Sequence, residues 1–405
     1  MSAERSFKPQ ENAEPILSSE VSLLGGIELH KPIALLPRDR VVSDEELLLA
    51  AQEMKPNFEG KTLPEQIELA QAWIMPQVIA SHIHEHTQLN GQVALAPQTQ
   101  AIADRVRQQS QDFQLATQDF AVQTNLDAVR QRLRESDMSI SSDVPDEVRA
   151  AVRLLHVDWQ VLSDLDNTLT DHKLLAIVNG IDPTLVGSAI ADPLNASNRE
   201  NFPELYAAIW RPLLLAFPEV FAEGGKAAPI REGADELFRY LIAEKILVSI
   251  LSTNFKHFPR ETIRRIAGDA ASQINLFTVT ADEELVAGLP VYGAVAVDKG
   301  NVLLRIAAMD QGRAIVYFGD GSSDRPALSE EARKVVAVYF ALEGSTFHKE
   351  LLALQKDHPE IIFFTYKTGH DIRMKLEEIG GISEYLQGQE KENDRERRFS
   401  AHAAA

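Results

Sequence analysis

The pattern of apolar and polar residues changes character near Pro145. Before this point, from residue 43 onward, apolar residues recur in helical stretches, and residues 43–46 look like a capped helix start. Residues 1–42 contain several prolines and show no sustained period. We therefore expect an extended leader over 1–42 and a separate α-helical domain over 43–150.

From Trp159 onward, short apolar runs alternate with helical segments. The runs WQVLSDLD, ILVSILS, RAIVYFGD and KVVAVYFAL are almost continuously apolar, which is typical of strands buried on both faces of a parallel sheet. The stretch between the first two runs is far longer than the roughly 10–12 residues that a crossover needs, so we predict a helical insert, or cap, over about 171–228. These features predict an α/β core over 151–386 and a charged, disordered tail over 387–405.

Composition narrows the possible functions. The formal net charge of −20 disfavours nucleic acid and acidic membranes as partners. Because the chain has no cysteine, disulfides, thiolate metal sites and thiol nucleophiles are excluded, and a reducing, cytoplasmic location is expected. No apolar run approaches the ~18 residues that a membrane span requires, and the first residues contain no apolar signal segment, so we expect an unprocessed chain outside the membrane.

Two pairs of acidic residues follow predicted strands. Asp164 and Asp166 end an apolar run, and residues two apart on an extended chain point to the same face. Asp320 and Asp324 lie in GDGSSD after another apolar run, where the glycines permit a tight turn. Since open α/β sheets bind ligands at the carboxyl ends of their strands, the four carboxylates are expected to converge. Their mutual repulsion and their hard oxygen donors favour a bound Mg²⁺.

Two further segments supply groups that bind phosphate. Ser252 and Thr253 end the run ILVSILST and precede a helical segment, where a hydroxyl and free main-chain N–H groups form an anion site. Lys299 opens another helical stretch and supplies a cation. Taken singly, each feature has a common structural explanation as a surface turn, a capping hydroxyl or a solvated charge. Their occurrence together, each at a strand end or a helix start, favours one catalytic site.

The elements DLDNT, STN, the lysine and GDGSSD resemble motifs I to IV of the haloacid dehalogenase-like (HAD) superfamily. The resemblance covers about residues 157–345. The long insert after motif I, the turn at 230–234 and the segment 276–297 resemble the phosphoserine-phosphatase-like branch, whose cap is of the C1 type. The resemblance implies a Rossmann-like parallel sheet with a helical C1 cap inserted after its first strand.

The resemblance also implies a mechanism, the Mg²⁺-dependent hydrolysis of a phosphomonoester. Asp164 attacks phosphorus to form an aspartyl-phosphate, while Asp166 protonates the leaving oxygen and then activates water. Dehalogenase members lack an acid at this second position, so Asp166 disfavours dehalogenation. The implied roles are catalysis for Asp164 and Asp166, phosphate binding for Thr168, Ser252, Thr253 and Lys299, and metal binding for Asp164, the main-chain carbonyl of Asp166, Asp320 and Asp324, the last supporting either the metal or the lysine.

The cap is expected to select the substrate. Residues 170–173 read TDHK and lack the glutamate that phosphoserine phosphatases usually carry for the substrate amine, so phosphoserine is not favoured. Arg199 and Arg211 in the cap are candidates to bind an anionic substrate group, although ion-paired surface positions are the commoner outcome. A lid of this length favours a small phosphorylated metabolite, or a phosphorylated side chain on a flexible segment.

Two other functions stay open. A phosphotransferase or mutase would pass the phosphoryl group from the same aspartyl-phosphate to an acceptor other than water. Alternatively, residues 1–150 carry an interaction or targeting function and the HAD-like core serves as a sensor. The N-terminal region matches no pattern that names a partner.

Overall fold

The computed structural model describes residues 44–62, 118–171 without 142, 218–279, 295–309 and 311–403, together with the short pieces 23–24, 27–28, 65–66, 69, 285–286 and 289–290. The chain divides into two compact units, one formed by residues 1–96 and 208–220 and the other by 97–207 and 221–405. The described elements of the first unit are an antiparallel pair and a helix that continues into a 3₁₀ turn: β1 (Leu23–Leu24), β2 (Ile27–Glu28), α1 (Asp44–Met54) and η1 (Lys55–Phe58).

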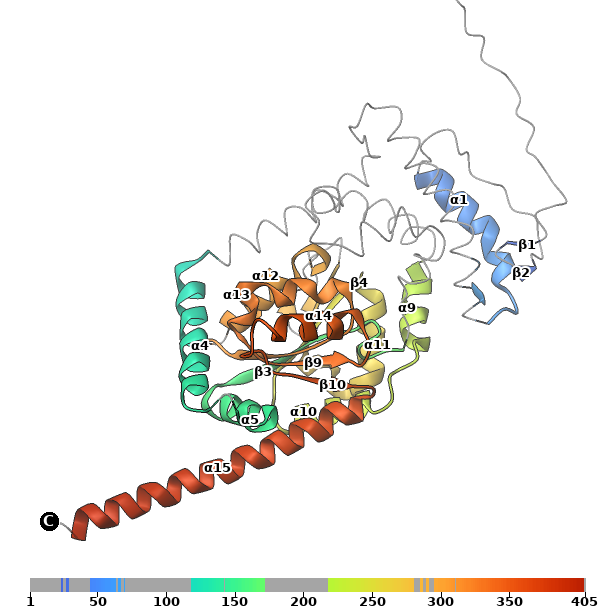
Figure 1. Ribbon diagram of the computed structural model, residues 1–405. Helices are drawn as coiled ribbons and strands as arrows, with labels where there is room; N and C mark the ends of the chain where they lie inside the picture. The colour runs from blue at the N-terminus through green and yellow to red at the C-terminus, as the bar shows by residue number, and fades with distance from the viewer. Residues whose placement is uncertain are drawn as a thin grey trace, which may run out of the picture. The chain divides into compact units, whose positions relative to one another are not determined.

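The second unit is built on a six-stranded sheet in which every neighbouring pair is parallel (Figure 1). Its strand order is β10-β9-β8-β3-β4-β5. The strands are β3 (Trp159–Asp164), β4 (Val248–Phe255), β5 (Ile274–Val279), β8 (Ala314–Gly319), β9 (Val336–Leu342) and β10 (Phe363–Tyr366). The strand order reverses between β3 and β8, and sheets of this kind bind ligands at such a point. The predicted α/β class and Rossmann-like parallel sheet are confirmed.

Continuous apolar runs form the central strands because both faces of the sheet are covered. All six residues of β8 are buried, as are five of the six in β3. Aromatic rings pack between neighbouring strands, with the ring centroids of Phe318 and Phe340 5.3 Å apart and nearly perpendicular. This packing joins β8 to β9, its neighbour on one side.

Helices cover both faces of the sheet. In Figure 1, α12, α13 and α14 lie together on one side, while α5, α10 and α15 lie on the other. The helical elements of this part of the chain are α4 (Phe120–Met138), α5 (Asp146–His156), α9 (Pro218–Ala227), α10 (Ala234–Ala243), α11 (His257–Ala267), η3 (Gly268–Gln273), α12 (Val295–Ala308), η4 (Ser322–Leu328), α13 (Glu330–Arg333), α14 (Thr346–Gln355) and α15 (Gly369–Ala403). A short antiparallel pair, β6 (Leu285–Val286) and β7 (Leu289–Pro290), precedes α12 where the sequence resembles a hairpin region.

The predicted domain boundary at residue 150 is wrong, because α4 and α5 belong to the unit that contains the sheet. Helix α4 packs on α12, where the Asn125 side-chain amide donates to the Ala308 carbonyl at 2.8 Å. Helix α5 packs on α15, where the Ser383 hydroxyl donates to the Ala151 carbonyl at 3.0 Å. Helical periodicity shows that a helix has an apolar face, but it does not show which element covers that face.

The prediction of a disordered tail over 387–405 is also wrong for residues 387–403. These residues continue α15 as one helix to Ala403, and Figure 1 shows this helix extending beyond the sheet. The segment QGQEKENDRERRFSAHA is rich in Gln, Glu, Lys, Arg and Ala, which are strong helix formers, and it contains no proline. The high charge of this segment predicts disorder, but the helix propensity of its residues outweighs the effect of the charge.

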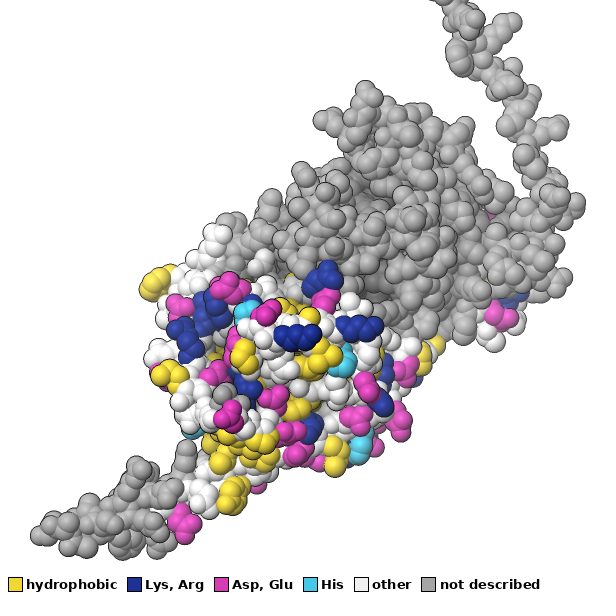
Figure 2. Space-filling view, viewed as in Figure 1, with side chains coloured by type: hydrophobic (Ala, Val, Ile, Leu, Met, Phe, Trp, Pro, Cys, Tyr) yellow, Lys and Arg dark blue, Asp and Glu magenta, His cyan; other side chains and the backbone are white. Residues whose placement is uncertain are grey.

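The described surface carries charge of both signs. On the face shown in Figure 2, acidic and basic side chains of the described residues are interspersed. None of the described helices combines the length and the apolar character needed to span a bilayer.

Candidate active site

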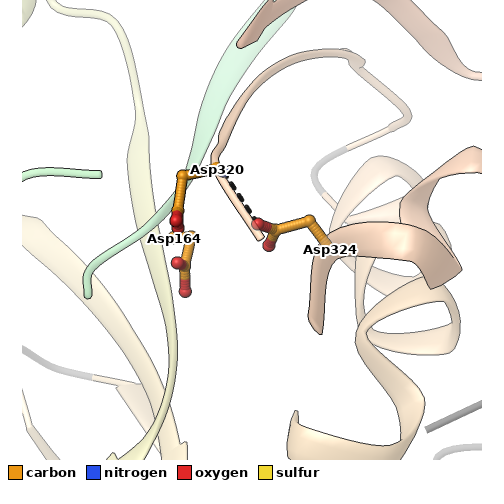
Figure 3. A group of neighbouring side chains, drawn as sticks. All are labelled: Asp164, Asp320 and Asp324. Atoms are coloured by element: carbon orange, nitrogen blue, oxygen red, sulfur yellow. Dashed lines mark hydrogen bonds between the residues drawn. The ribbon is translucent and has the colours of Figure 1, made fainter. Parts of the chain in front are cut away.

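Two of the acidic residues predicted to form the site lie at the carboxyl ends of the two central strands. Asp164 is the last residue of β3, and Asp320 directly follows β8. Ser163 is paired with Phe318, so the two strands end at the same level. Figure 3 shows the Asp164 and Asp320 carboxyl groups beside each other, with Asp324 reaching toward them from η4. One carboxylate oxygen of each lies within 4.8 Å of the others, so three of the four predicted carboxylates converge.

A buried lysine joins these acids. The Lys299 ammonium, on α12, donates to Asp164 Oδ1 at 2.8 Å and to Asp324 Oδ1 at 2.7 Å. The next residue, Gly300, lies so close to η4 that a Cβ there would be 2.7 Å from the carbonyl oxygen of Pro326. The absence of a side chain at this position therefore lets α12 approach η4 and brings the lysine to the carboxylates.

Both oxygens of Asp324 are already used by protein donors. Oδ1 accepts from Lys299 and, at 2.8 Å, from the buried Tyr317 hydroxyl. Oδ2 accepts from the main-chain N–H groups of Asp320 and Gly321, each at 2.9 Å. The geometry favours a supporting role, in which Asp324 holds the lysine and the loop that carries Asp320, over direct metal binding.

The turn after β3 holds Asp320 in place. The Asn167 side-chain amide donates to Asp320 Oδ2 at 2.8 Å, and the Thr168 hydroxyl lies 3.3 Å from Asp320 Oδ1 and 3.5 Å from Asp164 Oδ2. Thr168, expected to bind phosphate, is placed to orient both carboxylates. Asn167 was missed by the sequence reasoning; its φ of 60° is left-handed, a conformation that Asn tolerates better than most residues, so an Asn after the acid pair was the available signal.

Of the remaining predicted site residues, the structure shows the side chains of some but not of others. Asp166 and Ser252 are both buried, and the Ser252 hydroxyl lies 3.4 Å from Asp166 Oδ2, so motif II reaches the acid pair. Thr253 lies in β4, but its side chain is outside the described residues, and so are Arg199 and Arg211.

Burial and neighbouring charge shift the pKa values of the cluster in opposite directions. Burial raises the pKa of Asp164 well above its ordinary value, the Lys299 ammonium opposes this rise, and the carboxylates of Asp324, Asp320 and Asp166 add to it. Burial alone would also raise the pKa of Asp324, but Lys299 and the hydrogen bonds to Asp324 lower it below its ordinary value. Burial alone would lower the pKa of Lys299, yet the two carboxylates raise it. Lys299 and Asp324 therefore form a charged pair, while burial disfavours the ionised form of Asp164.

The two ends of the predicted cap insert lie side by side, while residues 172–217 of this insert lie outside the described residues. Thr170 forms an antiparallel bridge with Ile230, and the Asp171 N–H donates to the Pro229 carbonyl at 2.9 Å. The predicted turn that re-enters the core at 230–234 is therefore observed. The segment between Asp171 and Pro229 leaves and returns to the core at one point, six residues beyond β3.

The donor set suits a hard divalent cation. Asp164 and Asp320 supply buried carboxylate oxygens on adjacent strand ends, and the described site contains no sulfur donor. Burial first, and then the neighbouring carboxylates, raise the pKa of Asp164, and a bound cation would oppose both effects. Asp164 and Asp320 are the described groups that fit Mg²⁺, and the main-chain carbonyl of Asp166 is a ligand that the sequence resemblance implies.

No protein-family model and no curated protein matches this sequence. Among solved structures, a substrate-bound phosphoserine phosphatase complex is 16% identical, with 53% of this chain and 96% of that chain covered and a TM-score of 0.34. The cytosolic 5′-nucleotidase IIIB bound to cytidine is 14% identical, with 63% and 99% covered and a TM-score of 0.39. A probable phosphoserine phosphatase from Vibrio cholerae is 16% identical, with 61% and 69% covered and a TM-score of 0.34.

These similarities are too low to assign a family, so the site is described by the geometry of this chain alone. The sheet is parallel with β3 at its centre, Asp164 ends that strand, and the chain leaves the sheet a few residues later, at the bridge between Thr170 and Ile230. The lysine and the second acid pair reach the same point from α12 and from the end of β8. The second unit thus has a Rossmann-like parallel sheet, with Asp164, Lys299 and Asp320 gathered at the carboxyl ends of its two central strands as predicted.

Proposed function

We propose that this protein is a Mg²⁺-dependent phosphatase that hydrolyses a phosphomonoester through an aspartyl-phosphate on Asp164. One observation carries the proposal: Asp164 is buried at the end of the central strand, with the Lys299 ammonium 2.8 Å away and the Asp320 carboxylate beside it. Ordinary packing does not gather several buried acids around one lysine, because the desolvation of each charge is costly. A site that binds a dianionic phosphoryl group and a cation explains the cluster.

In the first step, an oxygen of Asp164 forms a bond to phosphorus as the bond to the leaving oxygen breaks. Lys299 holds Asp164 Oδ1, so Oδ2 is the oxygen left to attack, and Thr168 lies 3.5 Å from it. Asp166, two residues along, supplies a proton to the leaving oxygen. The Ser252 hydroxyl and the Lys299 ammonium bind the phosphoryl oxygens.

In the second step, water hydrolyses the aspartyl-phosphate. Asp166, now ionised, accepts a proton from the water as the new bond to phosphorus forms and the bond to Asp164 breaks. Inorganic phosphate leaves and both carboxylates return to their initial states. Bound Mg²⁺ would neutralise the negative charge between Asp164 and the phosphoryl group.

We also propose that the substrate is a small phosphorylated molecule, or a phosphorylated side chain on a flexible segment. The support is the position of the cap connections, which are bridged through Thr170 and Ile230 beside the acid pair, so that everything inserted there starts at the mouth of the site. A segment of this length at the mouth is expected to exclude water and bulky phosphoproteins.

Hydrolysis of p-nitrophenyl phosphate tests the proposal. We expect turnover that requires Mg²⁺ and stops in excess EDTA, and Asp164→Asn should lower kcat by about 10³-fold or more, because the amide is a poor nucleophile. Asp269→Asn, at an exposed position in η3, is the matched control and should retain activity. Full activity in EDTA would contradict the metal assignment, and a near-normal Asp164→Asn would show that Asp164 is not the nucleophile. Transfer of phosphate to an added alcohol faster than to water would favour a phosphotransferase.

A further inference from the structure

One largely buried cation next to the site has no part in the mechanism above. Arg231 follows Ile230, where the chain re-enters the core from the cap, and its side chain is only 11% exposed. Its ion pair with Asp171, at 3.1 Å, is a weak reason for this burial, because the Asp171 side chain is 51% exposed and solvent screens the pair.

The guanidinium instead binds three main-chain carbonyls. Nε donates to the Thr168 carbonyl at 2.9 Å and Nη2 to the Asn167 carbonyl at 2.8 Å. Nη1 donates to the Lys367 carbonyl, just before α15, at 2.8 Å. The rigid, planar fork of arginine suits such a set of fixed acceptors, and no other side chain can donate in three directions from one plane.

The turn that Arg231 grips is the one that holds the metal-site carboxylates. Asn167 and Thr168 point their carbonyls at Arg231, while their side chains donate to Asp320 at 2.8 and 3.3 Å. Asn167 also has the left-handed φ of 60°. This conformation is strained for a residue other than glycine and persists only where its surroundings fix it. Arg231 is therefore connected to Asp320 through Asn167 and Thr168, each of which contacts Arg231 with its main-chain carbonyl and Asp320 with its side chain.

We propose that Arg231 is a positioning residue that fixes the Asn167–Thr168 turn and thereby holds Asp320 and Asp164 in the geometry that binds Mg²⁺. This inference rests on the proposed function. It gives a role to Arg231, the residue after the bridge between Thr170 and Ile230. The point where the chain re-enters the core and the metal site are then joined by one rigid contact. Loss of Arg231 loosens the donors of Asp320 without removing any group that touches the phosphoryl.

Arg153 provides a matched control within the same unit. It is also buried, and it binds the Ala337 carbonyl at 2.8 Å, the Glu360 carbonyl at 2.7 Å and the Asp137 carboxylate. These contacts lie near the start of β9 and before β10, at the opposite edge of the sheet from the strand ends that carry the site. Arg153→Met therefore removes the same kind of clamp without touching the catalytic turn.

The test compares full-length wild type, Arg231→Met, Arg231→Lys and Arg153→Met. Titration with MgCl₂ alone, followed by the thermal unfolding temperature, gives a Mg²⁺ midpoint that requires no turnover. Partners that orient metal ligands typically change affinity by about 10–100-fold, so we expect Arg231→Met to raise the midpoint about tenfold. Arg231→Lys, which keeps the charge but not the fork, should fall between Arg231→Met and wild type. Arg153→Met should lower the unfolding temperature at every MgCl₂ concentration and leave the midpoint unchanged.

Kinetics with p-nitrophenyl phosphate give a second readout. Arg231→Met should lower kcat at limiting Mg²⁺ and recover much of it at saturating Mg²⁺, with a smaller change in KM. Midpoints that are equal in Arg231→Met and wild type, or that shift equally in Arg153→Met, would overturn the inference and leave the proposed function standing. A wild type that binds Mg²⁺ but hydrolyses no phosphomonoester would remove the proposed function, and the midpoints would still decide the role of Arg231.

Discussion

The substitution Asp324→Asn separates the two roles that the sequence allows for this residue. Asp324 accepts four hydrogen bonds, two at each oxygen, from Lys299, Tyr317 and the main-chain N–H groups of Asp320 and Gly321. An asparagine has the same shape but only one acceptor oxygen. If the amide oxygen faces the main chain, the NH₂ group opposes Lys299 and Tyr317; if it faces them, the NH₂ group opposes two N–H donors. Neither orientation satisfies all four donors.

The cost follows from this count. Each orientation leaves two buried donors without an acceptor, and each such donor costs about 1–3 kcal/mol, for a total of roughly 2–6 kcal/mol. For a folding unit of this size, about 1 kcal/mol shifts Tm by about 2–4 °C, so Asp324→Asn should lower Tm by roughly 5–20 °C. Lys299 also loses the partner that keeps it beside Asp164, so kcat should fall as well.

Thermal and urea unfolding, with and without Mg²⁺, measure the effect. Asp371→Asn is the matched control, because Asp371 Oδ2 alone accepts from the N–H groups of Lys367 and Thr368 at 2.9 Å, and an amide oxygen can keep both bonds. Its Tm should change little. An Asp324→Asn variant as stable as wild type would refute the four-donor argument. A variant that keeps its metal-free stability but no longer responds to Mg²⁺ would show that Asp324 is a metal ligand.

Three further outcomes follow from the same cluster. Tyr317→Phe removes one donor from Asp324 and leaves no donor without an acceptor, so unfolding in urea should show a loss of about 1.5–3 kcal/mol, smaller than for Asp324→Asn; a larger loss would contradict this. Burial raises the pKa of Asp164 in the folded state, so ionisation of this group opposes folding of the metal-free protein. In EDTA, the wild type should therefore lose stability relative to Asp164→Asn as the pH rises above 3.8. At lower pH the stabilities of the two proteins should converge. Parallel stability profiles of these two proteins would refute that assignment. Gly300→Ala should lower both stability and kcat, because its Cβ would lie 2.7 Å from a carbonyl of η4, whereas Gly381→Ala, with nothing within 4 Å, should stabilise α15 by about 0.5–1 kcal/mol; equal effects in thermal unfolding would contradict the close approach.

The strands and the convergence of the motifs could be predicted because both depend on short-range pattern. Runs such as RAIVYFGD have no polar face and can only be central strands covered on both sides. Once those strands are parallel, their carboxyl ends meet at one edge, so Asp164 and Asp320 must lie close together wherever the intervening segments go.

Long-range partners could not be predicted in the same way. Leu126, Val129 and Leu133 give α4 an apolar face, but its cover, α12, lies far along the sequence. The predicted boundary at residue 150 rests on a change in the sequence pattern, from helical segments to strands that alternate with helices. Such a change marks a domain boundary only when the preceding helices do not pack on the sheet.

The roles of individual polar residues depend on still finer geometry. Residue spacing places Asp320 and Asp324 on one loop but does not separate metal binding from a supporting role for Asp324. In the structure, the Tyr317 hydroxyl and two N–H groups surround Asp324, while side-chain donors from the turn after β3 orient Asp320. Rotation about a single bond can turn a donor group from solvent toward a carboxylate. Residue spacing does not specify such a rotation. The same limit explains why Asn167 was missed, since its importance comes from a left-handed φ and an amide directed across to β8. In such a site, sequence identifies which charges gather, and the hydrogen bonds decide which of them remains available for chemistry.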